Sequence, residues 1–141
     1  MIEFYSEDID FQLNNSELTE AWISKVIENH SFKLGDISFI FCTDDYLLNV
    51  NREYLQHDYY TDIITFDYVE DNVVSSDIFI SIDRIKENAE EFKVSFENEL
   101  NRIIIHGILH LLGFKDKEPE QKKIMTSKED ESLALLDELS C

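Results

Sequence analysis

Two histidines and an aspartate in the last third of the chain have the spacing of metal ligands. His106 and His110 are four residues apart in the segment HGILHLLGFKD, so on a helix their imidazoles project from one face. Gly113 allows a sharp turn after such a helix, and Asp116 can then approach the imidazoles from another direction. Three protein ligands leave one position open for water, whose pKa zinc lowers to about 7. The spacing therefore predicts a catalytic site for one Zn²⁺ per chain, or for another divalent transition metal.

The same two histidines could instead be structural. Each imidazole could donate to a backbone carbonyl inside the core, with Asp116 an exposed loop residue. The helix is otherwise apolar, however, and burying an unpartnered polar group costs about 1 to 3 kcal/mol, which favours a metal site. A zinc peptidase of the H-E-x-x-H type would place its general base where this chain has Gly107. We interpret that glycine as a point where another backbone passes close to the helix or where substrate needs room.

The composition indicates one acidic domain. A chain of 141 residues, 43% of them hydrophobic, can bury one core, so we expect a single domain over residues 1–141. The 12 Lys and Arg against 31 Asp and Glu give a formal charge of −19, which opposes general affinity for polyanions. Five lysines nevertheless follow the histidine segment closely: Lys115, Lys117, Lys122, Lys123 and Lys128. They could concentrate positive charge beside the predicted site, or they could lie on the solvated face of a helix.

No segment resembles a targeting or membrane-spanning sequence. The amino terminus, MIEFYSEDIDFQ, is acidic and lacks an apolar run, and the longest apolar runs are too short to cross a bilayer. Cys42 and Cys141 form neither a disulfide framework nor a CxxC pair. We therefore expect a cytoplasmic protein with no membrane partner.

Periodicity and turn residues predict four strands, near residues 1–5, 37–42, 61–68 and 76–81. Gly35 is expected to end the connection before the second strand, and Asp71 and Asn72 to form a hairpin turn between the last two. This pattern predicts an α+β fold, with a small mixed four-stranded sheet, helices packed mainly on one face and a buried metal-ligand helix.

Helices are expected over about residues 16–29, 44–55, 84–92, 96–112 and 119–138. The expected caps are Asn15 or Ser16, Thr43, Asp83 and Ser95, and Pro119 lies in the first turn of the last helix. That helix should turn four residues inward: Ile124, Met125, Leu133 and Leu136.

The chain resembles the YbeY-type family of bacterial metal-dependent endoribonucleases. The family signature H-G-x-L-H-L-x-G-x-D-H is matched here by HGILHLLG over residues 106–113. A second pattern, N-x-x-Y-R followed by T-D-V-L-S-F, is similar to Asn51, Tyr54 and residues 61–66, and SDIFIS is similar to G-D-I-x-I-S. The resemblance spans about residues 48–136 and includes Met125 and Glu129 in the last helix.

This resemblance implies a zinc-dependent endoribonuclease that cleaves single-stranded RNA in ribosomal RNA maturation, including 16S rRNA 3′ end processing and ribosome quality control. Metal-bound water would attack a phosphodiester or assist the attack, and the ion would neutralise charge on the phosphoryl oxygens. The implied partners are single-stranded or ribosomal RNA, together with ribosomal proteins or a ribosome-associated GTPase. No side chain stands out as the general base.

Two positions depart from the family pattern. Asp116 stands at the third histidine, which gives two imidazoles and one carboxylate and shifts metal preference toward iron or manganese. Leu55 stands at an arginine expected to contact the substrate phosphate, which leucine cannot do. Arg52 or His57 could replace that contact, or both could simply be exposed. Asp62 could orient substrate or a ligand histidine, or it could cap neighbouring backbone.

Two other functions are compatible with the sequence. A peptidase-like metallohydrolase would suit the acidic surface, although Gly107 opposes it. A ribosome-assembly factor with a structural or vestigial metal site would fit Leu55 and the net charge. Structural zinc sites usually close the fourth position with another Cys or His, and none is obvious nearby. The sequence does not indicate the oligomeric state.

Overall fold

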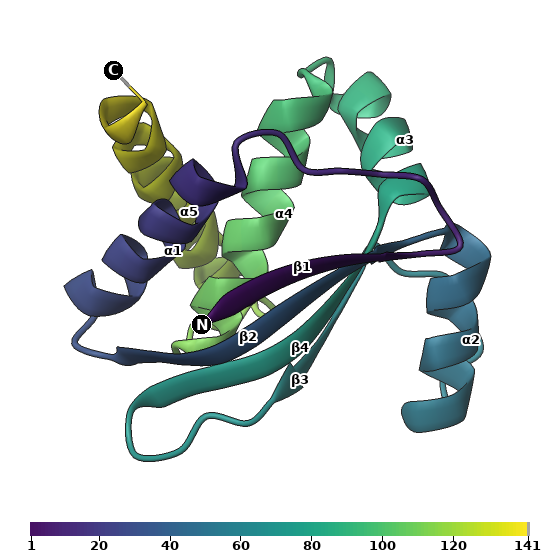
Figure 1. Cartoon of the computed structure of the whole chain (residues 1–141), viewed down its shortest axis with the longest axis horizontal. Helices are drawn as coiled ribbons and strands as arrows, with labels where there is room; N and C mark the ends of the chain where they lie inside the picture. Colours follow the sequence, from purple (N-terminus) through teal and green to yellow (C-terminus); the bar gives the residue numbers. More distant parts are fainter. Residues whose placement is uncertain (141) are drawn as a thin grey trace.

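A mixed four-stranded sheet forms the centre of the computed structural model, which describes residues 1–140 (Figure 1). The strands β1 (Ile2–Glu7), β2 (Lys33–Cys42) and β4 (Val73–Ser81) run parallel to one another. The strand β3 (Ile63–Asp67) pairs antiparallel with β4, in the order β1-β2-β4-β3. β3 is therefore an edge strand of the sheet.

The predicted hairpin is confirmed, whereas the expected role of Gly35 is wrong. Asp71 and Asn72, with φ of 52° and 64°, make the turn between β3 and β4. Gly35 lies inside β2, because that strand begins at Lys33 and pairs there with the start of β4. A Cβ atom on Gly35 would stand 2.9 Å from the carbonyl oxygen of Val74, so this glycine permits close strand packing.

Within residues 1–140 there are five helices: α1 (Ser16–Asn29), α2 (Asp44–Tyr54), α3 (Ile82–Phe92), α4 (Phe96–Leu111) and α5 (Pro119–Leu139). Three expected caps are confirmed, since the side chains of Asn15, Thr43 and Ser95 each accept a backbone N–H of the first turn. In this part of the chain no helix has both the length and the apolar character needed to cross a membrane.

The cap of α3 is Ser81 and not Asp83, which corrects the sequence prediction. The Ser81 hydroxyl accepts the N–H of Arg84, so the helix starts at Ile82. The Asp83 carboxylate instead accepts the N–H of Asp44 at the start of α2, 2.9 Å away. Asp83 thus caps a different helix through a tertiary contact.

The helices lie mainly on one face of the sheet, as expected. Figure 1 shows α1, α4 and α5 together on one side, over a core that includes Trp22, Phe39, Ile78 and Ile104. The other side carries α2, which covers a smaller cluster around Cys42. Burial, with Asp83 and Asp44 nearby, raises the pKa of the Cys42 thiol to about 12, so the thiol stays protonated. The other cysteine, Cys141, lies outside the described residues.

The inner face of α5 differs from the predicted one by one residue. Met125 is buried, and Leu133 and Leu136 pack against the core, but Ile124 is 53% exposed. The buried stripe runs through Met125, Glu129 and Ser132, which are spaced four and three residues apart. Ile124 precedes the first of them by about 100° of helix rotation and so points to solvent.

Candidate metal site

The buried helix α4 presents both histidines to one cleft. Its apolar residues fix the helix in the core, where Ile104, Ile105 and Ile108 are fully buried. The side chain of His106 is 20% exposed and that of His110 is 42% exposed, and their ring centroids are 5.8 Å apart. The helix therefore holds one imidazole against the protein and leaves the other open to solvent.

Asp116 approaches the two imidazoles as the spacing predicts. Gly113, with φ of 104°, turns the chain after α4. One carboxylate oxygen of Asp116 then lies 3.2 Å from Nε2 of His106, and the other lies 3.8 Å from Nε2 of His110. The alternative of core histidines that donate to backbone carbonyls does not describe this arrangement, since both imidazoles face a carboxylate.

These atoms fit the ligand set of a divalent ion, with one small adjustment. Ligands at zinc bond lengths in a tetrahedral site are separated by about 3.3 Å, close to the 3.2 Å between Asp116 and His106. Within the described residues no three His, Cys, Asp or Glu side chains are already drawn together in coordination geometry. The contact of Asp116 with His110 would have to shorten by about 0.5 Å, which rotation of an exposed side chain allows.

Glu129 holds His106 from behind, a role that the sequence analysis did not assign. One carboxylate oxygen of Glu129 lies 2.7 Å from Nδ1 of His106, and the other accepts a hydrogen bond from Arg102 at 2.8 Å. A carboxylate only accepts, so Nδ1 carries a proton, and in the neutral imidazole Nε2 is the nitrogen left to bind a cation beside Asp116. The signal in the sequence is a carboxylate on the buried stripe of α5, where an apolar residue would be usual.

Nearby charges also act on the His106 imidazole. Burial disfavours its charged form, but the hydrogen bond to Glu129 and the negative charges of Glu129, Asp116 and Asp62 outweigh burial and raise the pKa of His106. The same carboxylates make this end of the cleft attractive to a divalent cation.

Replacing Glu129 by glutamine should weaken metal binding about 10- to 100-fold, because an uncharged amide has only one acceptor oxygen for the two donors, His106 and Arg102. Competition against a zinc-binding dye would measure this change in affinity. Asp130→Asn is the matched control, since Asp130 also accepts from Arg102, at 2.6 Å, but does not touch His106. Equal zinc affinity in the two variants would contradict the orienting role.

The cleft joins the metal candidates to the predicted substrate-side residues. It has a volume of about 470 Å³, within the usual range for ligand sites. Its walls include His106, His110, Asp116, Asp62, His57 and Leu55. The structure therefore brings together every site residue that the sequence analysis singled out for this reaction, except Arg52.

Arg52 does not take the place of the arginine that Leu55 replaces. Its guanidinium pairs with the carboxylate of Asp58, and it does not line the cleft. His57 does line the cleft. Of the two substitutes that the sequence suggested, the structure thus leaves only His57 in a position to meet substrate.

Asp62 forms part of the cleft wall and also bonds to nearby groups. Burial raises the pKa of its carboxyl. His106 and the backbone N–H groups of Asp62 and Ile63 lower this pKa, but by less than burial raises it. The Asn88 amide donates to this carboxylate at 3.5 Å, and the Asp62 carbonyl accepts the N–H of Ser81 at 3.0 Å. Asp62 thus fixes the start of β3 while adding negative charge beside His106.

Gly107 permits close contact between α4 and β3. A Cβ atom at this position would lie 2.9 Å from Cδ1 of Ile63 and 3.2 Å from Cγ2 of Thr65. The close neighbours are therefore side chains of the edge strand, and not the passing backbone that the sequence suggested. Gly107 also lines the cleft, which is compatible with its second predicted role of leaving room for substrate.

The lysines near the site are mostly on solvated surface. Lys115 and Lys117 are exposed on either side of Asp116, and Lys122 and Lys123 are exposed on α5. Lys128 lies 3.6 Å from Glu131 and stands over the ring of Phe114.

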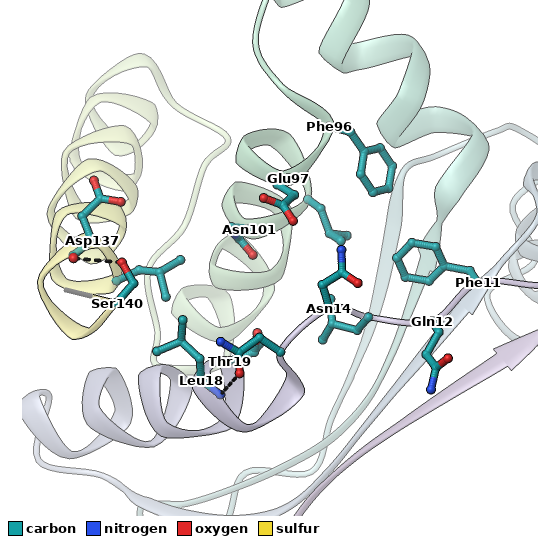
Figure 2. Close-up of a pocket in the computed structure, with 14 residues that line it drawn as sticks. Phe11, Gln12, Asn14, Leu18, Thr19, Phe96, Glu97, Asn101, Asp137 and Ser140 are labelled. Atoms are coloured by element: carbon teal, nitrogen blue, oxygen red, sulfur yellow. Dashed lines mark hydrogen bonds between the residues drawn. The ribbon is translucent and has the colours of Figure 1, made fainter.

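A second pocket, of about 350 Å³, lies between the amino-terminal loop, α1, α4 and α5 (Figure 2). Phe11 and Phe96 meet edge to face there, with ring centroids 5.9 Å apart. The described residues that line it include Glu97 and Asp137 but no His, Lys or Arg. Its acidic lining suits neither phosphate nor the ligand set above, so the cleft at α4 is the better candidate site.

Comparison with known proteins identifies the family. Residues 1–137 match the family model described as Endoribonuclease YbeY. Proteins named Endoribonuclease YbeY from Parabacteroides distasonis and Phocaeicola vulgatus are 52% and 48% identical, over 97% and 96% of this chain and 96% and 99% of their own lengths. The solution structure of TM1509 from Thermotoga maritima matches with a TM-score of 0.66 and 27% identity, over 99% of this chain and 89% of that one. The chain therefore belongs to the YbeY endoribonuclease family.

Proposed function

We propose that this protein is a metal-dependent endoribonuclease that cleaves single-stranded RNA during ribosomal RNA maturation, including processing of the 16S rRNA 3′ end. The observation that supports it most is the meeting of His106, His110 and Asp116 in one open cleft, with His106 oriented by Glu129. Relatives of nearly the same length, about half identical, carry the name Endoribonuclease YbeY.

His106, His110 and Asp116 would hold the ion, and a divalent cation there supplies Lewis acidity toward a phosphoryl oxygen together with an acidified water. The chain's own residues prepare the site. Glu129 accepts from Nδ1 of His106, so the neutral imidazole that binds the ion would present Nε2 on the cleft side. Arg102 keeps Glu129 in place, since its guanidinium donates to both Glu129 and Asp130.

A single-stranded substrate suits the shape of the site. The cleft lies between α4, the edge strand β3 and the segment from Leu55 to Thr61. Unpaired bases can splay away from the backbone and enter such a cleft, whereas the bases of a duplex stay stacked inside it. The sugar-phosphate chain could then approach Asp116 and the two histidines.

The net charge of −19 makes a recruiting partner part of the proposal. General attraction to RNA is weak for so acidic a protein, so ribosomal proteins or a ribosome-associated GTPase would bring it to its substrate in the cytoplasm. The donor set of two nitrogens and one carboxylate suits Zn²⁺, and also iron or manganese.

Metal removal tests this function directly. Protein purified without chelators should contain about one divalent ion per chain and should cut single-stranded RNA but not casein. Treatment with a chelator should abolish RNA cleavage, and Zn²⁺ added back should restore it. Elemental analysis and gel assays of both substrates are the measurements.

The outcomes separate the competing functions. Cleavage of casein by the metal-loaded protein would indicate a peptidase. Retained metal with neither activity would indicate an assembly factor. Full RNA cleavage after the ion has been removed would contradict metal dependence.

A further inference from the structure

We propose that His57 and Tyr59 form a stacking platform on which one base of the RNA rests while its backbone lies at the metal site. This inference rests on the function proposed above and specifies how the substrate is held. The two rings are stacked, with centroids 5.1 Å apart and planes 20° apart, and the Tyr59 hydroxyl lies 3.0 Å from Nδ1 of His57. Both residues line the same cleft as His106 and His110.

The platform is exposed and yet fixed in position. Tyr59 is 56% exposed, so much of its surface is open to a ligand. The buried side chain of Asn51 donates to the Tyr59 carbonyl at 2.9 Å, and the Asn51 carbonyl accepts the N–H of His57 at 3.1 Å. Arg52 pairs with Asp58 on the outside of the same segment. A base would therefore meet aromatic groups that are already ordered, which reduces the entropy lost on binding.

The charges of the cleft favour stacking over phosphate contacts. Leu55 occupies the lining where a cation would be expected to hold a phosphate, and Asp62 and Asp116 add negative charge. The whole protein carries −19. Stacking of a base on an aromatic ring needs no positive charge and accepts any base, so it can supply affinity that electrostatics cannot.

The neighbouring tyrosines are committed to other contacts. The Tyr60 hydroxyl donates to Asp45 at 3.1 Å, and the guanidinium of Arg84 lies over its ring. Tyr54 meets Phe66 edge to face. Neither of these two tyrosines lines the cleft, so among the tyrosines from 54 to 60 it is Tyr59 that is placed to meet the substrate.

The binding test uses a short single-stranded RNA that carries one 2-aminopurine, with the metal removed to prevent cleavage. Tyr59→Leu should weaken binding about tenfold and lose the quenching that stacking causes, while Tyr59→Trp should retain both. The slope of affinity against salt concentration should not change, since no phosphate contact is lost. Tyr68→Leu is the matched control, because Tyr68 is equally exposed but lies beyond β3, outside the cleft lining.

Cleavage by the metal-loaded protein supplies the second readout. Tyr59→Leu should raise KM about tenfold with kcat nearly unchanged. Binding by Tyr59→Leu as tight as by Tyr68→Leu, or no RNA binding by the unmodified protein, would overturn the platform. RNA binding that depends on Tyr59 without any cleavage would leave the platform standing and overturn the endoribonuclease proposal. Cleavage by Tyr59→Leu with an unaltered KM would overturn the platform and leave the endoribonuclease proposal standing.

Discussion

Replacing His110 by alanine should lower kcat/KM for single-stranded RNA about a hundred- to a thousandfold. The substitution removes one of three proposed ligands, and the remaining pair, His106 and Asp116, would hold an ion only weakly. The side chain of His110 is 42% exposed, so its loss should leave the fold nearly unchanged. Elemental analysis should show the metal content falling together with the activity.

His57→Ala is the histidine control for the metal content in this experiment. It removes an imidazole from the same cleft without touching the proposed ligands, so bound metal should stay at the level of the unmodified protein. Circular dichroism of both variants would show that the fold is retained. A His110→Ala protein with full metal content and full cleavage would contradict the ligand assignment.

Replacing Trp22 by alanine should lower the free energy of unfolding by about 3 to 5 kcal/mol. The indole is fully buried between α1 and the rest of the core, and its Nε1 donates to the carbonyl of Ser132 in α5 at 2.7 Å. The substitution opens a cavity and removes this buried hydrogen bond. Because a domain of this size is stable by only about 5 to 15 kcal/mol, the variant should be partly unfolded on warming.

Urea unfolding followed by circular dichroism would measure the effect of Trp22→Ala, since this variant lacks the only tryptophan of the chain. Ile124→Ala is the matched control, because Ile124 is an apolar residue of α5 that points to solvent. Its substitution should change the free energy of unfolding by less than about 1 kcal/mol. A loss in Trp22→Ala as small as in this control would contradict the anchoring of α5 by Trp22.

Features set by local sequence could be predicted, and those set by tertiary contacts could not. Thr43 and Ser95 cap their helices because the bond they make is with the next turn of the same chain. Asp83 has the same chemistry, but its partner is the N–H of Asp44 in another helix. Nothing within a few residues of Asp83 identifies that partner, so Ser81 was missed as the cap of α3.

The same distinction applies to the site. His106, His110 and Asp116 belong to one short segment, and their spacing alone places them close together. Glu129 reaches His106 from a different helix, and only the packing of α5 on α4 brings the two within 2.7 Å. Tyr59 likewise joins His106 and His110 in one cleft lining only through the tertiary fold.

The helix α4 serves the hydrophobic core and carries two of the proposed ligands, so metal binding at this site would couple conformational stability to metal supply. An ion that binds only the folded chain adds about 1.4 kcal/mol to the free energy of unfolding for each tenfold excess over its dissociation constant. In a cell rich in the ion, variants with core substitutions in α4 would therefore stay folded. In a cell that lacks the ion, the same variants would unfold more often and be degraded by proteases.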